Sequence, residues 1–560
     1  MTKRVSNKNK EYGQRERKQI GRSAMRKYLK TIKGYVILSI LCYCIETAIT
    51  SVILLLPGYL IDHYQDGLQK IGLISLVYFL LFIAYLFACY SGNRAADFRR
   101  VKFEKAIKKD FFNAVYDKNY QDFNCYDTGE YLSMQSNDIT EMIQNYLSPL
   151  LAIYRSLIMI AVFGGSLIVF VNPVITIAII GCSVLAVFVP WITANELSKR
   201  NGNYSNSVGK YTSKLKTYFE AHEIMDKNGV ETIKRKNEND LDSLLSDNMH
   251  FRKLNSLSMV LNGGSTEFVA VVSFIVIAFL LFSNRITVGM ATAAFVYSTK
   301  FTDPIYELSV NIGRVKSVKK IQEKLIEIST KKSDSDLKPL KDIQKITVTG
   351  VKKSFGEVNI EIPDMEFIYP KKYLIIGENG IGKSVLFRML MKFYEPDCGT
   401  IQYDGIERVN IDGLNTYSPQ STIVFKASYV DNVTLFGTYS KEKLSEYESY
   451  FPSELISQIK QNICSGELSG GEKQVVGLLR ALCSQKKIIL LDEPFSAMNN
   501  AVIEKFLNNL GKINSMIIIV AHNINEHSDK FDRTYTFIKD EDARLRFPTA
   551  NKASLKSESK

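Results

Sequence analysis

Residues 377–384 read Gly-Glu-Asn-Gly-Ile-Gly-Lys-Ser, and their types and spacing suit a loop that binds phosphate groups. An apolar run at 373–376 precedes this loop, and a run with helical spacing at 385–393 follows it, so the sequence predicts a strand–loop–helix unit. In such a unit the glycines let backbone N–H groups surround a β-phosphate, and the helix N-terminus adds a partial positive charge. We therefore expect a nucleotide-phosphate site, and the alternative is a glycine-rich turn without a ligand.

The last two residues of the loop carry its predicted chemistry. We expect Lys383 to reach the β- and γ-phosphates and the Ser384 hydroxyl to bind Mg²⁺. ATP and Mg²⁺ are therefore the expected cofactors. The predicted phosphate-binding residues are Gly377, Glu378, Asn379, Gly380, Ile381, Gly382, Lys383 and Ser384.

A second apolar run, at 488–491, ends in the two carboxylates Asp492 and Glu493. Buried strands of an open α/β sheet present their chemistry at their carboxyl ends. We expect Asp492 to hold Mg²⁺ through water and Glu493 to polarise an attacking water molecule. A third apolar run, at 516–520, leads to His522, which would lie at the same edge of the sheet; a packed or surface histidine is the alternative there.

Two further motifs lie in the sequence between the phosphate loop and the carboxylate pair. Residues 417–420 read Tyr-Ser-Pro-Gln, and residues 468–472 read Leu-Ser-Gly-Gly-Glu. Together with the phosphate loop, the carboxylate pair and His522, they make residues 346–540 resemble the nucleotide-binding domain of an ABC transporter. The resemblance implies an α/β P-loop ATPase fold.

The resemblance also implies roles that residue chemistry alone does not give. It implies Gln420 as the Q-loop glutamine and His522 as the histidine that senses the γ-phosphate. The implied catalytic residues are Glu493, His522 and Gln420, and the implied magnesium ligands are Ser384, Gln420 and Asp492. The signature, which would close on ATP held by a second copy, comprises Leu468, Ser469, Gly470, Gly471 and Glu472.

Two positions fit the family pattern less well. Phe355 stands where the family usually has an aromatic residue that stacks on adenine, but its short distance to the phosphate loop leaves a core position as the alternative. Asn499 stands where the family usually has Asp, and it keeps a hydrogen-bonding side chain without the charge. The loss of charge affects the expected communication between two ATP sites, not the catalytic groups, so each copy is expected to hydrolyse ATP.

The N-terminal half is predicted to span a membrane. The mean hydropathy of −0.05 hides six long apolar stretches, each near the ~20 residues that cross ~30 Å of hydrocarbon as a helix. These stretches cover residues 34–62, 71–92, 148–171, 173–194, 261–283 and 286–311. The sixth contains Asp303, Pro304 and Glu307, so a buried amphipathic helix is its alternative.

The charge distribution predicts the orientation. The chain has 71 Lys and Arg against 58 Asp and Glu, a formal net charge of +13. Many of the basic residues lie in 1–33, whereas the expected outer loops offer little beyond Lys70 and Arg285. The positive-inside rule places both termini in the cytosol, and anionic lipid is an expected partner. Nucleic acid is not, since no basic groove with aromatic readers is evident.

The predicted fold is an all-α membrane domain with six helices, followed by the α/β ATPase domain. The expected segments are a basic cytosolic segment at 1–33, the transmembrane domain at 34–318, a linker at 319–345, the nucleotide-binding domain at 346–540 and a polar tail at 541–560. Two long cytosolic loops, 93–147 and 195–260, interrupt the membrane domain. Part of the first loop, 126–138, resembles the loop of ABC exporters that carries a short coupling helix, and the second coupling helix is expected around 214–223.

Three ionisable residues lie within the predicted spans: Glu46, Arg155 and Glu267. Charges inside a membrane are costly and often functional, so one interpretation is a cavity that contacts a charged or peptidic substrate. The alternative is an Arg155–Glu267 structural pair, or snorkelling at the inner leaflet.

The expected working unit is two chains, either two identical copies or this chain with a homologous half-transporter. The leading hypothesis is ATP-driven export of a peptide, lipid or amphipathic small molecule. An importer on the exporter fold, as for metal–siderophore uptake, and a membrane ATPase with a sensing or gating role remain alternatives. The Lys-, Ile- and Asn-rich composition favours a bacterial plasma membrane.

Overall fold

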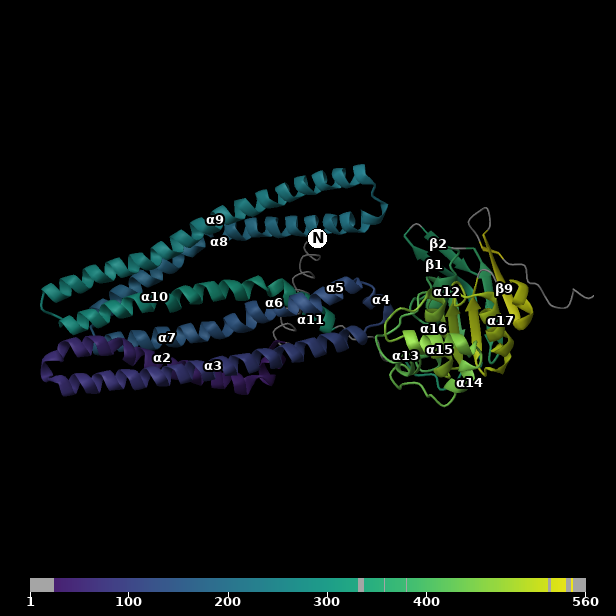
Figure 1. The fold of residues 1–560 in the computed structure, drawn as a ribbon, viewed down its shortest axis with the longest axis horizontal. Helices are drawn as coiled ribbons and strands as arrows, with labels where there is room; N and C mark the ends of the chain where they lie inside the picture. The colour runs from purple at the N-terminus through teal and green to yellow at the C-terminus, as the bar shows by residue number, and fades with distance from the viewer. Residues whose placement is uncertain are drawn as a thin grey trace, which may run out of the picture. The chain divides into compact units, whose positions relative to one another are not determined.

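The computed structural model describes residues 25–330, 337–356, 358–378, 380–521, 525–539 and 545–546. The chain forms two compact units: Met1–Tyr116 with Asp127–Lys331, and Asp117–Tyr126 with Lys332–Lys560. The first unit consists of long helices, and in the second, helices cover strands (Figure 1). The short segment Asp117–Tyr126 thus belongs with the second unit, although the chain on both sides of it belongs to the first.

Six long helices make up most of the first unit. They are α2 (Lys33–Asp62), α3 (Leu68–Tyr116), α7 (Ser148–Phe170), α8 (Pro173–Glu220), α9 (Lys227–Phe282) and α10 (Val288–Ser317). Shorter elements join them: η1 (Tyr64–Asp66), α5 (Thr128–Ser133), η2 (Met134–Asp138), α6 (Ile139–Met142), η3 (Ile143–Leu147), η4 (Ala221–Ile224) and α11 (Lys319–Thr330). The turn before α8 is short because Asn172 caps the helix by accepting a hydrogen bond from the Val174 N–H, and Pro173 occupies its first position.

The predicted spans lie in these six helices. Within the part of the chain that the structure describes, four continuous helical stretches are long and apolar enough to cross a membrane, and the third of them runs from α5 through α7. The four are Lys33–Asp62, Leu68–Tyr116, Thr128–Phe170 and Lys227–Phe282. On α8, among the residues whose side chains the structure describes, the apolar stretch is Pro173–Ser183, which is shorter than a span. Helix α10 falls short because polar residues such as Thr302 and Asn311 lie on its buried face, which fits the alternative of a buried amphipathic helix.

Helix α2 is polar on its buried face and apolar on its exposed face. Its buried polar residues are Ser39, Glu46, Thr47 and Ser51, and its exposed apolar residues include Ile37, Leu38, Leu41, Ile45 and Val52. This is the reverse of a water-soluble helix, in which the apolar stripe faces the core. The exposed face of α2 therefore suits lipid, and on its buried face Ser39, Glu46 and Ser51 are hydrogen-bonded inside the bundle.

The predicted linker at 319–345 is only partly extended. Its first twelve residues form α11, which belongs to the helical unit and packs against α3. An amphipathic pattern explains the helix, because Leu325, Ile326 and Ile328 are buried while charged residues alternate with them. The sequence analysis predicted a linker here because residues 319–345 are rich in Lys, Asp and Ser.

The second unit contains two sheets. The larger has the strand order β10-β9-β4-β8-β7-β6, and the smaller, antiparallel sheet has β2-β1-β3 with β5 also on β1. The strands are β1 (Lys345–Phe355), β2 (Val358–Ile362), β3 (Met365–Ile368), β4 (Lys372–Gly377), β5 (Cys398–Tyr403), β6 (Asn415–Ser418), β7 (Ile488–Asp492), β8 (Met516–Val520), β9 (Arg533–Lys539) and β10 (Leu545–Arg546). The helices are α4 (Tyr120–Phe123), α12 (Lys383–Leu390), α13 (Tyr429–Thr434), α14 (Leu444–Glu448), α15 (Ser453–Asn462), α16 (Gly470–Cys483) and α17 (Asn500–Asn509), with the 3₁₀ turns η5 (Leu510–Lys512) and η6 (Asn525–Lys530).

The central strands are buried on both faces. In β7, Ile488 and Leu490 enter the core shared with α12, whereas Ile489 and Leu491 enter the core shared with α16 and α17. A parallel sheet covered on both faces has such continuous apolar strands. Because β9, β4, β8, β7 and β6 are parallel, the residues that follow β4, β6, β7 and β8 meet at one edge, which is where the predicted site lies.

Candidate ATP-binding site

The phosphate loop leaves β4 at Gly377 and ends where α12 begins at Lys383. Gly382 has φ 104° and lies against β2, so that a Cβ there would be 2.6 Å from Ile360 Cγ2. Gly380 also has a positive φ, of 80°. Only glycine adopts this path without strain, so the loop needs the glycines that the motif supplies. Asn379 lies outside the described residues.

Lys383 is buried within the loop. Its Nζ donates hydrogen bonds to the carbonyl oxygens of Gly377 (2.6 Å) and Glu378 (2.7 Å). Burial lowers the pKa of Lys383, and the charges of Glu493 and Asp492 oppose that shift. The ammonium group is therefore held by the loop backbone, close enough to both carboxylates for their negative charges to act on it.

Asp492 ends β7 and is 4% exposed. Its Oδ2 accepts a hydrogen bond from the Tyr417 hydroxyl (3.1 Å), whereas its Oδ1 has no hydrogen-bond partner among the described residues. Burial raises the pKa of Asp492, and hydrogen bonding from Ser384 and Tyr417 acts in the opposite direction. A buried carboxylate oxygen without a partner, beside a serine hydroxyl, is a donor set that fits Mg²⁺.

Glu493 follows directly and adopts a positive φ of 49°, which is uncommon for a residue other than glycine. Its backbone N–H donates to the Val520 carbonyl on β8 (2.9 Å). Its Oε2 accepts a hydrogen bond from Gln420 Nε2 (2.6 Å). The structure thus brings together Gln420 and Glu493, which lie 73 positions apart in the sequence. Such backbone conformations concentrate at functional sites.

The signature segment begins α16. Ser469 caps the helix by accepting a hydrogen bond from the Glu472 N–H (3.3 Å), and the Glu472 Oε2 accepts one from the Ser469 N–H (2.7 Å). Leu468 is buried beneath the cap. A Cβ on Gly471 would lie 2.6 Å from the Ala497 carbonyl oxygen. The signature is therefore packed against the segment that follows Glu493.

Gln474 is a residue that the sequence analysis missed. It is buried on α16, and its Nε2 donates to Ser496 Oγ (2.7 Å) and to the Glu493 carbonyl (3.3 Å). Its Oε1 accepts a hydrogen bond from the Ala497 N–H (3.0 Å). Gln474 therefore holds the signature helix to the backbone of the catalytic candidate. A polar side chain on the apolar face of an otherwise amphipathic helix was the available signal.

Phe355 does not lie in the core. It ends β1, is 39% exposed, and meets Tyr394 edge to face with ring centroids 5.4 Å apart. The ring is thus partly exposed, and its role toward adenine stays a prediction. His522 lies outside the described residues, so its predicted role also stays a prediction.

Asn499 caps α17, where its side chain accepts a hydrogen bond from the Val502 N–H (2.9 Å). We expect Asn499→Ala to lower the stability of this unit by about 1 kcal/mol, a decrease of about 2–4 °C in its unfolding temperature. Asn499→Asp should keep the cap and the temperature, because aspartate caps equally well. Scanning calorimetry of the purified protein measures this, with the exposed neighbour Asn500→Ala as control. Equal unfolding temperatures for Asn499→Ala and Asn499→Asp would contradict the capping role.

The candidate substrate-path residues in the helical unit divide into a pair and a separate residue. Arg155 Nη2 of α7 donates to Glu46 Oε1 of α2 (2.5 Å), and its guanidinium lies 5.5 Å from the Tyr43 ring. The suggested Arg155–Glu267 pair is therefore wrong: α2 and α7 pack together, and Glu267 of α9 is exposed.

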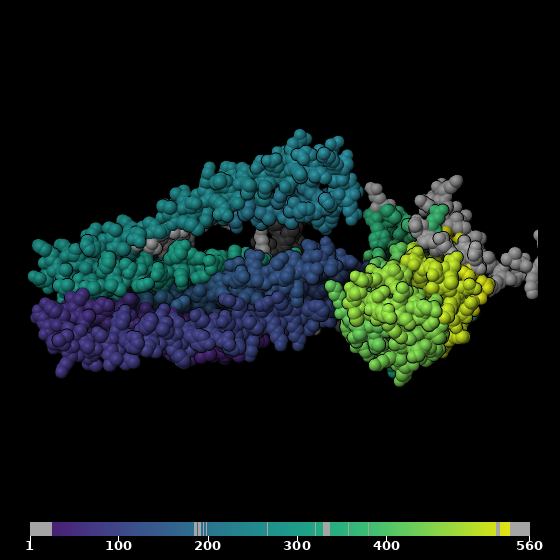
Figure 2. Space-filling view, viewed as in Figure 1, coloured from purple at the N-terminus to yellow at the C-terminus, as the bar shows by residue number. Residues whose placement is uncertain are grey.

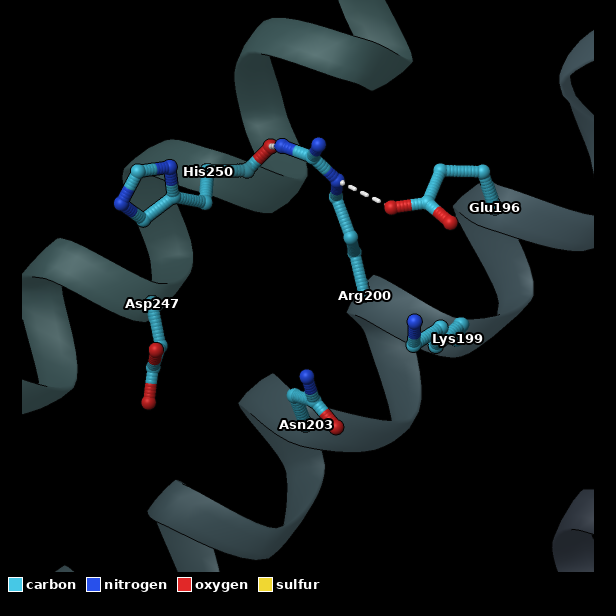
Figure 3. A pocket seen from close by; sticks show the side chains of 6 residues that line it. All are labelled: Glu196, Lys199, Arg200, Asn203, Asp247 and His250. Carbon is cyan, nitrogen blue, oxygen red and sulfur yellow. Dashed lines mark hydrogen bonds and ion pairs between the residues drawn. The ribbon is translucent and has the colours of Figure 1, made fainter.

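A separate cavity of about 250 Å³ lies between α8 and α9 (Figure 3). It is lined by Glu196, Lys199, Arg200, Asn203, Asp247 and His250. Arg200 crosses it, donating to Glu196 Oε1 (3.0 Å) and to the His250 carbonyl oxygen (3.3 Å). No residue predicted for ATP or substrate lines this cavity.

Comparisons with known proteins agree with this geometry. Family models match residues 36–305, as an ABC transporter transmembrane region, and residues 362–496, as an ABC transporter. A mesentericin transport/processing ATP-binding protein of Leuconostoc mesenteroides is 24% identical over 511 residues, which are 85% of this chain and 69% of that protein. The aliphatic sulfonates import ATP-binding protein of Zymomonas mobilis is 31% identical over 205 residues, 35% of this chain and 82% of that protein.

A solved structure extends the likeness of fold to both units. A bacterial Atm1-family ABC exporter with ATP bound has a TM-score of 0.74 at 17% identity, over 91% of this chain and 93% of that chain. The two family models cover both the helical unit and the edge of the sheet where Asp492 and Glu493 lie. The chain belongs to the ABC transporter family, with a membrane-spanning domain and an ATPase domain that drives transport on one polypeptide.

Proposed function

We propose that this chain is a half-transporter that works as a dimer and exports a peptide, a lipid or an amphipathic small molecule. The observation that carries the proposal is the convergence of Lys383, Asp492, Glu493 and Gln420 at one sheet edge, on a chain whose fold matches an exporter over 91% of its length. The likeness to a mesentericin transport/processing protein makes a peptide the first cargo to test. The ATPase unit does not decide direction, because it also matches an import protein.

The site residues have separable roles in this proposal. Residues 377–384 cradle the phosphates, and Lys383 turns from the loop carbonyls to the β- and γ-phosphates. Ser384, Asp492 and Gln420 would hold Mg²⁺, which when bound neutralises charge on the phosphate oxygens. Glu493 accepts a proton from the attacking water, which Gln420 helps to position through its hydrogen bond to Glu493. His522 senses the γ-phosphate, and Phe355 stacks on adenine.

The helix pair α8 and α9 supports a dimer. These helices run side by side (Figure 1), are joined by η4, and form the teal arm along the upper edge of the space-filling view (Figure 2). Near this junction Phe219 is 71% exposed and Ile224 is 81% exposed. Large apolar side chains exposed at a polar helix tip suit a contact with another protein surface. We assign this tip to the second coupling contact, with the other chain as its partner.

We further propose that the protein lies in a bacterial plasma membrane with both termini in the cytosol. The exposed apolar face of α2 and the basic residues before it support this orientation. The proposed domain bounds remain 1–33, 34–318, 319–345, 346–540 and 541–560. The partner is a second copy or a homologous half-transporter.

A mixed dimer tests whether two copies share each ATP site. Ser469→Asp keeps the N-cap but adds a negative charge that repels a γ-phosphate across the interface, and Lys383→Ala disables the phosphate loop. We expect each homodimer to lose at least about a hundredfold in ATPase rate, whereas a dimer of one chain of each kind regains one intact site and measurable activity. Two affinity tags isolate the mixed dimer, and Ser469→Thr, which keeps the hydroxyl, is the control. A mixed dimer as inactive as both parents would contradict shared sites.

A further inference from the structure

The four-residue helix α4 (Tyr120–Phe123) lies within Asp117–Tyr126, the part of the first long loop that belongs to the ATPase unit. Asn119 caps it, accepting a hydrogen bond from the Asp122 N–H (2.8 Å). The chain enters α4 from the end of α3 at Tyr116, and leaves it toward α5, where Asp127 and Glu130 form a capping box. Both neighbouring helices belong to the membrane unit, so α4 joins the two units covalently.

Tyr120 makes two aromatic contacts inside the ATPase unit. Its ring stacks on Phe393, with centroids 4.4 Å apart and planes 8° from parallel. It also meets Tyr394 edge to face at 5.8 Å. Phe393 and Tyr394 follow two residues after the helix that begins at Lys383 and ends at Leu390, and both of their N–H groups donate to the Arg388 carbonyl oxygen. The rings that receive Tyr120 are therefore fixed to the end of the phosphate-loop helix.

Phe393 connects Tyr120, through Tyr417, to the magnesium-binding candidate Asp492. Phe393 meets Tyr417 edge to face at 6.4 Å, and the Tyr417 hydroxyl donates to Asp492 Oδ2 (3.1 Å). Phe387 of α12 also meets Tyr417 edge to face, at 6.3 Å. A change in the orientation of the Asp492 carboxylate is thus transmitted to a packed ring, because protein interiors resist local displacement.

Tyr394 connects Tyr120 to Phe355, the candidate for stacking on adenine. Tyr394 meets Phe355 edge to face at 5.4 Å. Tyr120 therefore lies at the branch of an aromatic fork, which we define as Tyr120, Phe393, Tyr417, Tyr394 and Phe355. One arm ends at the Asp492 carboxylate, and the other ends at an exposed ring. These two ends correspond to the opposite ends of a bound nucleotide, its metal-bound phosphates and its base.

We propose that Tyr120 is a positioning residue through which both ends of the ATP site act on the docking of α4. This proposal rests on the proposed function, since it requires that Asp492 and Phe355 contact MgATP. Aromatic pairs contribute enough that loss of one changes an equilibrium by about threefold to tenfold. By linkage, nucleotide that favours the docked helix must bind more tightly, by the same factor, when the helix is docked. The arm that ends at Asp492 should make the docking of α4 depend on Mg²⁺. The arm that ends at Phe355 should make it depend on nucleotide even without the metal.

Hydrogen–deuterium exchange of the full-length protein in lipid nanodiscs tests the fork, in a Glu493→Gln background that retains ATP. We expect MgATP to slow exchange in residues 117–126 of the parent protein and of Tyr120→Phe, which keeps the ring. In Tyr120→Leu the protection should disappear and the Kd for MgATP should rise threefold to tenfold. Gln121→Ala, an exposed position on the same helix, is the control and should behave like the parent.

Two further variants separate the arms and provide a test if Tyr120→Leu does not fold. Tyr417→Phe removes the hydrogen bond to Asp492 but keeps the ring, so it should abolish the difference in protection between MgATP and ATP with EDTA. Tyr394→Leu should reduce the protection by ATP with EDTA. A parent that binds no ATP would overturn the proposed function itself. A parent that binds ATP, with unchanged protection and Kd in Tyr120→Leu and Tyr417→Phe, would overturn the fork alone.

Discussion

Glu493→Gln should abolish ATP hydrolysis and leave ATP binding intact. The glutamine keeps the size of the side chain and can remain beside Gln420, which donates to Glu493 Oε2 at 2.6 Å in the native protein. It cannot accept a proton from water, and positioned general bases contribute about 10²–10⁴-fold to a rate. We therefore expect the ATPase rate to fall at least about a hundredfold, while the Kd for ATP changes little.

A phosphate-release assay and equilibrium binding of a fluorescent ATP analogue measure the two quantities on the same sample. Glu504→Gln on α17 is a matched control, since Glu504 is exposed and outside the sheet edge. Lys383→Ala gives the opposite pattern, with binding lost as well. If Glu493→Gln keeps more than a tenth of the native rate, another residue is the base.

Breaking the Glu46–Arg155 pair should have the largest effect on the membrane unit. Glu46 is 11% exposed and Arg155 is 38% exposed as side chains. Arg155→Leu leaves a carboxylate without its partner inside the bundle, which costs about 3 kcal/mol, the lower end for broken buried pairs. We expect less folded protein and earlier thermal unfolding, with an equal or smaller loss in the double variant Glu46→Gln/Arg155→Leu.

Size-exclusion chromatography of heated, detergent-solubilised protein measures the folded fraction. Glu267→Gln is the control, because Glu267 is exposed on α9 and does not contact the pair. If the single and double variants both unfold at the native temperature, the pair is not structural, and its interpretation as part of a substrate cavity gains support.

Local sequence patterns predicted the parts of the site that are continuous in the chain. The phosphate loop, the Asp492-Glu493 pair at the end of β7 and the Ser469 helix start all follow from runs of fewer than ten residues. The predicted strands at 373–376 and 516–520 correspond to β4 and β8, because buried parallel strands are continuously apolar. The predicted helix at 385–393 ends earlier, at Leu390. The chain leaves the helical conformation there, and Lys392 adopts a positive φ of 57°.

Contacts between distant segments were not predictable in this way. Nothing near Arg155 in the sequence indicates Glu46 as its partner, because that pairing depends on how α2 and α7 pack. The hydrogen bonds of Gln474 and the stacking of Tyr120 on Phe393 arise for the same reason. The sixth predicted span, α10, shows the limit of composition, because its buried Ser298 and Thr302 hydroxyls donate hydrogen bonds to backbone carbonyls of the same helix.

The most direct test of the central claim, ATP-driven export, is comparative mass spectrometry of cells and medium from the native host. Wild-type protein is compared with Glu493→Gln expressed at the same level. The account predicts a molecule that disappears from the medium and accumulates in cells when Glu493 is replaced. A molecule that instead stays in the medium and is missing from cells would contradict export and establish import.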